Sequence, residues 1–584
     1  MPRTPALWDS STRKEVYDLL VELWPQLEDQ DRSDLVENIG AGPPGWLTSH
    51  LPEEDRDQFR ARRVFERLRI MERSDPERLH AGLEAELGRL RERYPHWDVA
   101  PGEQAHFAFY SQSGWRTLGA VEDKQRLQAM TPVAIIEELD SDERGDTLDA
   151  WREMVASDWG KMEAVLRGIA ERRGPDAELW ASTLAGLRTK AASADPDENV
   201  LALVADMDEV LAADPAVSSA AAYLLESVAS SSQFGQTPLD EFWRAFDKIA
   251  SGVSIDDSNA RHPQENDWVS VAINTSMGNL ALAFLNAMFA QRLVVGGGIP
   301  SELRQRYIWL IGQGDQRHRP ARIIFASRLS YLFAIDPGLT RSHLLPFFQW
   351  ERNGTEALAV WQGFGWQPHF DPLLWSELKT DFLECFTEER IARLGDMVRT
   401  LAQILAVAGI HIGLDELPRQ PTQAALRRLD PESRSGVLQW LTGALVRGED
   451  QTSDPDQVWN DKVKPWILKF WPRDPISRDS SEARPWVEMA LATNAAFEDA
   501  VETVVPFIRR GENGFVLHEL SESPHVSAHP RAAVKLMDAF LSREVQFWSF
   551  TELRSVLDNA AASEPALRAD PVFLQWHEFE QARA

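Results

Sequence analysis

Cysteine is almost absent from this sequence, since Cys385 is the single cysteine in 584 residues. One cysteine cannot form a disulfide within the chain, and no Cys/His cluster has the spacing of zinc ligands. The sequence therefore predicts no metal site and fits a reducing compartment. Cys385 lies in FLECFTEER among apolar neighbours, so we interpret it as a small buried hydrophobe rather than a nucleophile.

Long uncharged apolar runs are also missing. The N-terminal residues MPRTPALWDSSTRKEVYD contain no continuous apolar segment of the kind that a signal peptide requires. A membrane-spanning helix needs about 18 or more such residues, and the longest apolar segment, Leu280 to Ala290, is shorter than that. It predicts a buried helix, and we expect a cytoplasmic protein without membrane association.

Motifs that carry catalysis are not found. No Gly-x-Ser-x-Gly elbow is present. The stretch GAGPPGW (Gly40–Trp46) has two prolines where a phosphate loop needs N–H donors, so Gly40 indicates a helix end. The second glycine run, VVGGGIP (Val294–Pro300), has no Lys-Ser or Lys-Thr after it and indicates a connector before a helix that begins near Ser301. We expect no cofactor.

Basic residues are outnumbered, because 61 Lys and Arg stand against 91 Asp and Glu and the net charge is -30. Such a charge repels phosphate backbones, so nucleic acid is an unfavourable direct ligand. The hydrophobic fraction of 43% and the 22 tryptophans exclude a disordered chain, because so much apolar surface has to be buried.

Helical periodicity is what the sequence has in abundance. Apolar residues recur three and four positions apart in short segments that end at Gly, Pro or Asp-Pro. Strand signals are few, and both Asn-Gly pairs (Asn353-Gly354, Asn513-Gly514) lack the alternating flanks of a hairpin. We predict an all-α fold, an elongated stack of helix pairs like a HEAT-type α-solenoid with few or no strands.

Polar, Pro and Gly residues cluster at several points, including Ser230–Asp240, Asp256–Asp267 and Asp415–Gln423. These breaks predict four blocks: an N-terminal helical region over residues 1–120, a second over 121–255, a middle block over 256–415 and a C-terminal block over 416–584.

Two stretches are candidates for binding a partner. In GDQRHRPAR, a histidine stands among three arginines, which suits a carboxylate or a phosphate. The alternative is a solvated helix start before Pro320. The stretch WQGFGWQPHFDPLLW (Trp361–Trp375) holds aromatic residues that anchor interfaces but equally fill cores. The candidate partner-binding residues are Arg317, His318, Arg319, Arg322, Trp361, Phe364, Trp366 and Trp375.

Several segments together resemble a known family. They are AINTSMGNLALAFLNAM from Ala272, GDQRHRPARIIFASRLSYLFAIDPGLTRSHLLPFF, EALAVWQGFGW, SSTRKEVYDLLVELWP with GAGPP, AFYSQSGWRTLG from Ala108, FWRAFDKIA, WILKFWPRD, AFEDAVETVVPFI and LRADPVF. This succession resembles the helical region of unknown function that follows the NAD-hydrolysing domain in bacterial antiphage sirtuin-type proteins. A sirtuin-type hydrolase would place a Rossmann-like domain in front, whereas this chain begins with helices.

The resemblance implies a sensor or regulatory scaffold in bacterial antiviral defence. Such a protein recognises a phage or host protein and restrains or releases a separate effector. The sequence leaves open whether the chain forms a homo-oligomer. The alternative is a cryptic enzyme, of NAD hydrolase or nuclease type, whose catalytic groups converge from distant helices.

Overall fold

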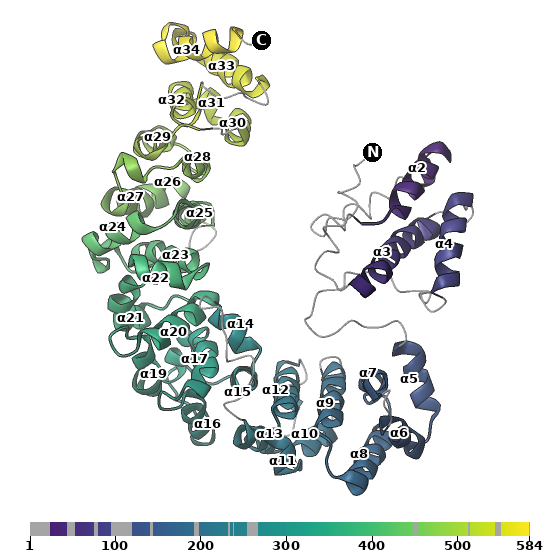
Figure 1. The fold of residues 1–584 in the computed structure, drawn as a ribbon. Coiled ribbons are helices and arrows are strands. Elements are labelled where there is room, and N and C mark those ends of the chain that lie inside the picture. The colour runs from purple at the N-terminus through teal and green to yellow at the C-terminus, as the bar shows by residue number, and fades with distance from the viewer. Residues whose placement is uncertain are drawn as a thin grey trace. The chain divides into compact units, whose positions relative to one another are not determined.

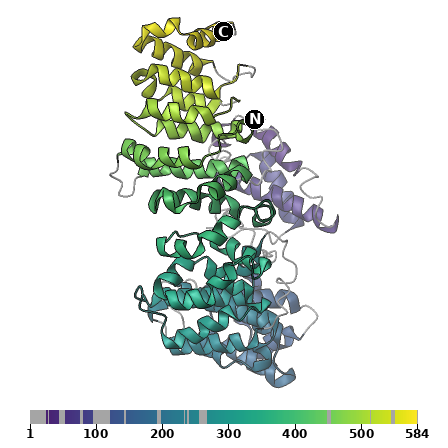
Figure 2. The ribbon, with the colours of Figure 1, turned by 90° about the vertical axis from the view of Figure 1, so that its left-hand side faces the viewer.

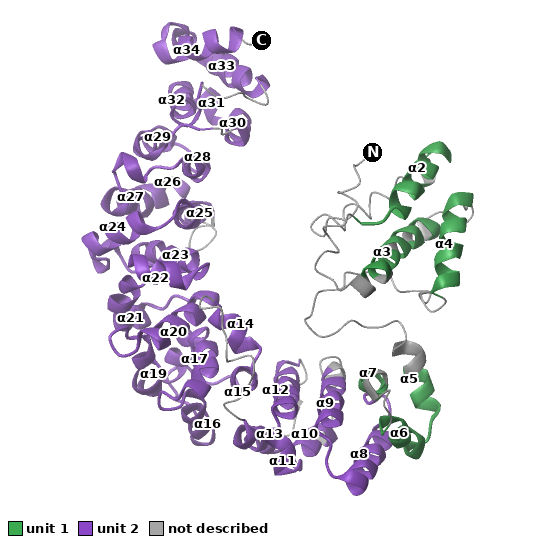
Figure 3. Cartoon of the chain, viewed as in Figure 1, with its two compact units in different colours: residues 1–154 green, residues 155–584 purple. Residues whose placement is uncertain are grey.

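The computed structural model describes residues 24–27, 29–43, 53–74, 80–94, 120–140, 144–191, 198–231, 234–236, 239–253, 267–447, 454–511, 514–543 and 550–582. Every regular element in these ranges is helical, and an isolated backbone bridge joins Gly511 to Leu541. The predicted all-α fold is therefore confirmed for this part of the chain. The chain forms two compact units, residues 1–154 and 155–584 (Figure 3). The four-block division stays a prediction.

Unit 1 holds two groups of helices. Their bounds are η1 (Trp24–Gln26), α2 (Asp29–Gly40), α3 (Glu53–Ser74), α4 (Ala81–Arg93), α5 (Ala120–Ala129), α6 (Pro132–Leu139) and α7 (Arg144–Met154). Helices α2, α3 and α4 pack against one another, and α7 packs against α5 and α6. The core of the first group includes Trp24, Ile39, Leu68 and Leu87.

The turn after α2 tests the interpretation of GAGPPGW. Gly40 is the last residue of α2, and Gly42 adopts a φ of 77°. The predicted helix end is confirmed for residues 40–43. Residues 44–46, residues 10–23 of the segment SSTRKEVYDLLVELWP, and the segment AFYSQSGWRTLG at 108–119 lie outside the described residues.

Unit 2 contains the remaining helices. Their bounds are α8 (Trp159–Arg173), α9 (Ala177–Ala191), α10 (Glu198–Ala205), α11 (Glu209–Ala212), α12 (Pro215–Ser230), α13 (Leu239–Gly252), α14 (Trp268–Ile273), α15 (Ser276–Ala290), α16 (Ser301–Ile311), α17 (Arg319–Ala326), α18 (Leu329–Ile335), α19 (Pro337–His343), α20 (Gly354–Trp366), α21 (Pro372–Glu384), α22 (Glu388–Leu394), α23 (Met397–His411), α24 (Arg419–Arg428), α25 (Pro431–Arg447), α26 (Pro455–Val458), α27 (Lys464–Phe470), α28 (Ala483–Leu491), α29 (Phe497–Val504), α30 (Gly514–Ser521), α31 (His525–Ala528), α32 (Pro530–Phe540), α33 (Thr551–Ser563) and α34 (Pro571–Gln581).

Short 3₁₀ or π segments connect these helices. They are η4 (Phe234–Gln236), η6 (Gln316–His318), η7 (Leu345–Phe348), η8 (Leu414–Glu416), η9 (Trp459–Val463), η10 (Pro475–Ser477), η11 (Ser480–Glu482), η12 (Val505–Phe507) and η13 (Pro565–Ala569).

The helices of unit 2 stack in two rows (Figures 1 and 2). In the first row, each helix contacts the next in the series α9, α12, α15, α17, α20, α23, α25, α28, α30 and α33. In the second row, α21, α24, α27, α29, α32 and α34 do the same. Because each helix buries its apolar face on its neighbours in the stack, this arrangement is solenoid-like, as the sequence predicts.

Asp-Pro pairs explain why many of the short helices begin where they do. The aspartate accepts hydrogen bonds from N–H groups of the first helical turn, and the proline takes a position where no N–H is needed. Six helices of unit 2 begin in this way, at Asp214, Asp336, Asp371, Asp430, Asp454 and Asp570. These pairs therefore mark where the next helix starts.

The apolar segment Leu280–Ala290 forms most of α15, and its side chains Leu280, Phe284 and Met288 are buried. The predicted buried helix is confirmed. No helix within the described ranges combines the length and the apolar character needed to cross a bilayer.

Candidate functional site

The predicted polar candidates lie where α17 begins, but they do not form one exposed group. Arg317 is exposed, and its Nε lies 2.8 Å from Oδ2 of Asp315. The N–H of Arg317 donates a hydrogen bond to Asp315, and this bond, with the charge of Arg317, lowers the pKa of the Asp315 carboxyl. Arg317 is therefore already paired with a carboxylate at the surface.

Arg322 is buried completely. Its Nε and Nη2 donate to Oε2 of Glu356 at 3.1 and 2.8 Å. The remaining donors reach backbone carbonyls, with Nη1 2.7 Å from the oxygen of Ile311 and Nη2 3.1 Å from that of Asp315. The guanidinium also lies over the ring of Phe347, 4.5 Å from its centroid. These contacts connect α17 to α20 and to the turn before η6.

Arg319 completes a buried triad with the same carboxylate. Its Nε donates to Oε1 of Glu356 at 2.6 Å, and its guanidinium lies 4.7 Å from the ring centroid of Trp268 in α14. Two cations therefore share one anion in a site that water hardly reaches. A group of this kind costs desolvation energy and requires well-placed donors, and removing one member leaves a buried charge unpaired.

His318 lies at a helix start, as predicted, but it is buried and not solvated. Its side chain is 3% exposed, its ring meets Trp309 edge-on at 5.1 Å, and Nδ1 donates to the carbonyl of Leu310 at 3.2 Å. Burial, followed by the charge of Arg317, lowers the pKa of His318. The expectation of a solvated histidine is therefore wrong, because the turn at Gly312 folds the ring against α16.

A cavity of about 360 Å³ lies beside the triad. Its lining includes Ser342, His343, Phe347, Arg352 and Glu356. Ser342 Oγ lies 2.7 Å from Nδ1 of His343, which is the contact that a nucleophile and its base would make. However, Nδ1 of His343 also lies 3.2 Å from the carbonyl oxygen of Leu339, which can only accept a hydrogen bond, and within the described part of the chain no carboxylate is hydrogen-bonded to His343. The imidazole is therefore held with Nδ1 as a donor and not as a base for Ser342.

The aromatic candidates of α20 and α21 form part of the core. Trp361 is 0% exposed and donates from Nε1 to the carbonyl of Phe348 at 3.1 Å. Phe364 and Trp375 are buried, and Trp366 at the end of α20 is half-buried. Most of this stretch therefore fills the core, which is the alternative to partner binding that the sequence offered.

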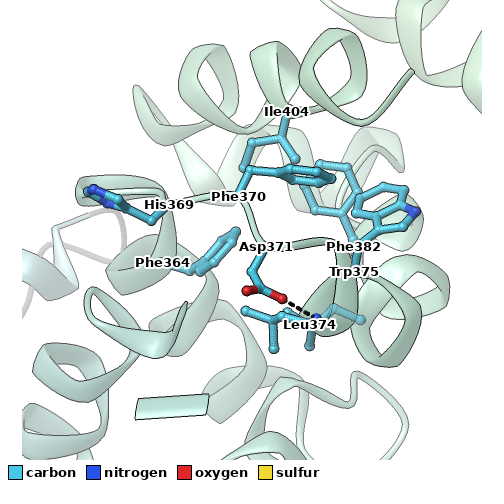
Figure 4. Close-up of a pocket in the computed structure, with 9 residues that line it drawn as sticks. Phe364, His369, Phe370, Asp371, Leu374, Trp375, Phe382 and Ile404 are labelled. Carbon is cyan, nitrogen blue, oxygen red and sulfur yellow. Dashed lines mark hydrogen bonds between the residues drawn. The ribbon is translucent and has the colours of Figure 1, made fainter. Parts of the chain in front are cut away.

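Figure 4 shows a small cavity that two of these candidates, Phe364 and Trp375, line together with neighbouring residues. Phe364, Trp375 and Phe382 line it, and Asp371 accepts a hydrogen bond from the N–H of Leu374 at 2.9 Å. Its volume is about 10 Å³, which is room for a water molecule at most. No organic ligand fits there, so these rings stabilise the fold.

Cys385 follows α21 and is buried, as the sequence predicts. Burial raises the pKa of its thiol, so the thiolate that acts as a nucleophile is disfavoured. Among the described residues, no three His, Cys, Asp or Glu side chains come together in a way that could hold a metal ion.

The loop between α15 and α16 carries a surface feature that sequence reasoning missed. It is a connector, as predicted, yet it exposes Val294 and Val295, at 75% and 74%. The N–H groups of Gly296 and Gly298 donate to the carbonyls of Ala334 and Ile335 in α18, at 2.8 and 3.0 Å. The signal was available as two adjacent valines before three glycines, but exposure cannot be derived from a single sequence.

Comparisons with known proteins provide little more. No protein family matches the chain, and no solved structure is similar to it. A curated relative is the "Uncharacterized protein y4cA" of Sinorhizobium fredii (strain NBRC 101917 / NGR234), which is 24% identical over 308 residues. The match covers 51% of this chain and 25% of that protein, so the matched half of this chain spans about a quarter of the relative's length.

Proposed function

We propose that this chain is a helical scaffold that binds a protein partner and regulates a separate effector. The observation that carries the proposal is the loop of residues 291–300, which presents Val294 and Val295 to solvent although its backbone is fixed on α18. Exposed apolar side chains on a fixed backbone are typical of a contact surface, because little ordering entropy is lost on binding.

The backbone geometry of this loop supports the proposal. Arg292 has a φ of 49°, and Gly296 and Gly298 have φ values of 72° and 81°. A non-glycine residue with positive φ is uncommon and persists only where its surroundings hold it. The side-chain carboxylate of Asp336 also accepts from the N–H of Ile299 at 3.2 Å. The valines therefore belong to a conformation that several independent hydrogen bonds maintain.

The regulatory part of the proposal comes from the resemblance to the helical region of antiphage sirtuin-type proteins. In this role the chain acts in the bacterial cytoplasm as a sensor of a phage or host protein. The effector is a second polypeptide or a second domain. The net charge of -30 favours a protein over a nucleic acid as the direct ligand.

The test is copurification of the tagged chain with the products of neighbouring genes, expressed together from the native locus. We expect a stoichiometric complex that Val294→Asp with Val295→Asp disrupts. Val446→Asp is the matched control, because Val446 is 68% exposed on α25. A chain that captures no product, or a complex that the loop variant leaves intact, contradicts the proposal. Depletion of NAD or ATP by the purified chain alone, lost in Ser342→Ala, would support the enzyme alternative instead.

A further inference from the structure

A groove lies between α8 and α10 in unit 2, with a volume of about 520 Å³. One wall is a single face of α8, formed by Trp159, Glu163, Leu166, Arg167 and Ala170. These residues are four, three, one and three positions apart, which is the spacing of neighbours on one side of a helix. From Trp159 to Ala170 this face extends over about 17 Å at 1.5 Å per residue.

The opposite wall is a matching face of α10 and the turn after it. Asn199, Ala202, Leu203 and Asp206 line it at the same helical spacing. Trp180 of α9 also lines the groove. The lining therefore contains two tryptophans, Trp159 and Trp180. The volume lies within the range of about 300–1,000 Å³ that is typical of ligand sites.

The groove combines an apolar lining with an excess of carboxylates. Glu163, Asp206 and Asp208 line it, against the single guanidinium of Arg167. Asp206 is paired with Arg244 at 2.6 Å, but both side chains are more than half exposed, so water screens this pair. Tryptophan faces attract cations, and carboxylates add to this attraction. The chemistry of the groove therefore complements a ligand that is both apolar and positively charged.

We propose that this groove binds an amphipathic, cationic helix of a partner protein, whose apolar side chains lie between α8 and α10. A groove that has helices as its walls and apolar side chains in its lining suits helix-in-groove recognition. Lysine or arginine side chains of the partner then meet Glu163, Asp208 and the faces of Trp159 and Trp180. The inference rests on the proposed scaffold function and names a surface and a partner chemistry for it.

The direct test uses the full chain and a fluorescent peptide of about 14 residues, which spans about 20 Å as a helix. The probe carries Leu on one face and Lys on the other. Two further peptides replace every Lys by Glu, or every Leu by Ser. Fluorescence anisotropy measures the dissociation constant, and circular dichroism measures helix formation. We expect the Leu/Lys peptide to bind as a helix, and the other two to bind at least about tenfold more weakly.

Matched variants on α8 separate the groove from the general negative field of the protein. Ala170→Arg places a long cation in the groove from an exposed position, whereas Ala164→Arg places it on exposed surface of the same helix outside the groove. Glu163→Lys and Glu171→Lys form a second pair with equal change in net charge. We expect the groove variants to weaken binding about tenfold and the controls less than about twofold.

Equal weakening by both members of each pair would overturn the proposal, because it would show attraction to the net charge alone. So would a Leu/Glu peptide that binds as tightly as the Leu/Lys peptide. If a copurified partner is lost in the Val294 and Val295 variant but binds Ala170→Arg normally, the scaffold function stands and the groove assignment fails. Peptide binding in the groove without any copurified partner would overturn the scaffold function instead.

Discussion

Arg322 of α17 and Glu356 of α20 form an ion pair inside unit 2, with Nη2 2.8 Å from Oε2 and neither side chain more than 3% exposed. The contact joins two neighbouring helices of the first row. The same arrangement occurs further along the stack, where Nε of Arg434 in α25 lies 2.5 Å from Oε1 of Glu482 in η11, also buried. Buried arginines therefore connect successive layers where purely apolar contacts would leave helix-end carbonyls unsatisfied.

Replacing the shared carboxylate should destabilise unit 2 strongly. In Glu356→Gln, two guanidiniums lose their counter-charge while remaining buried, and we expect the free energy of unfolding to fall by about 3–5 kcal/mol. Urea unfolding followed by circular dichroism measures the change. The control is Glu416→Gln, which breaks the exposed pair with Lys379 and should cost less than about 1 kcal/mol. Equal losses in both variants would refute a structural role for the triad.

The buried His318 should make stability depend on pH. Burial lowers its pKa from the ordinary 6.5, so the unfolded chain binds the proton more readily than the folded one. The stabilisation is therefore complete above pH 6.5 and is lost as the pH falls below 6.5 toward the lowered pKa. We expect the melting temperature of His318→Gln to change less between about pH 8 and pH 5 than that of the wild type.

The control for this prediction is His369→Gln, because the His369 side chain is exposed. That variant should keep the pH profile of the wild type. An unchanged profile in His318→Gln would contradict the assignment of a buried neutral imidazole.

Alanine substitutions at two glycines of α20 should change the stability of the chain in opposite directions. A Cβ at Gly363 would lie 2.4 Å from the carbonyl oxygen of Ile323 in α17, so Gly363→Ala must push two packed helices apart and cost about 1–3 kcal/mol. At Gly354 no heavy atom lies within 4 Å of the added Cβ. Gly354→Ala should therefore stabilise the chain by about 0.4–1 kcal/mol, through the unfolded state. Differential scanning calorimetry would show the two melting temperatures moving apart, and movement in the same direction would contradict the close packing of α17 on α20.

The aromatic stretch should behave as core. Trp361→Ala removes a ring that packs against Phe348, Phe364 and Phe382 and a hydrogen bond to a carbonyl, so we expect a loss of about 3–5 kcal/mol. Leu373→Ala in the same stretch should change stability by less than about 0.5 kcal/mol, because Leu373 is 73% exposed. Thermal melts distinguish the two. A mild effect of Trp361→Ala would favour the partner-contact interpretation.

The pattern of apolar residues was sufficient for the fold class, because the spacing that buries one face of a helix is local in the chain. Ser301 begins α16 and Leu280–Ala290 lies in α15, both as expected. The boundaries were less accurate. Apolar residues recur at helical spacing from Trp151 to Arg173, yet α7 ends at Met154 and α8 begins at Trp159, after the cap at Asp158. A capping aspartate is difficult to recognise inside an otherwise periodic segment.

The candidate residues show a second limit of prediction from sequence, which is the burial of individual side chains. The four candidates Arg317, His318, Arg319 and Arg322 are close together in sequence, but Arg322 of α17 is buried whereas Arg317 of η6 is exposed to solvent. The partner of Arg322, Glu356, is one of 91 acidic residues. No local signal distinguishes it from the others.

By itself, the sequence determined that the described chain is helical and that its charge is strongly negative, because these properties depend on local spacing and composition. Only the tertiary structure decided which charges are buried, that the aromatic stretch fills the core, and that α8 and α10 border a common groove. Burial and proximity arise when helices distant in the chain pack together, and a residue's own neighbours in sequence do not contain that information.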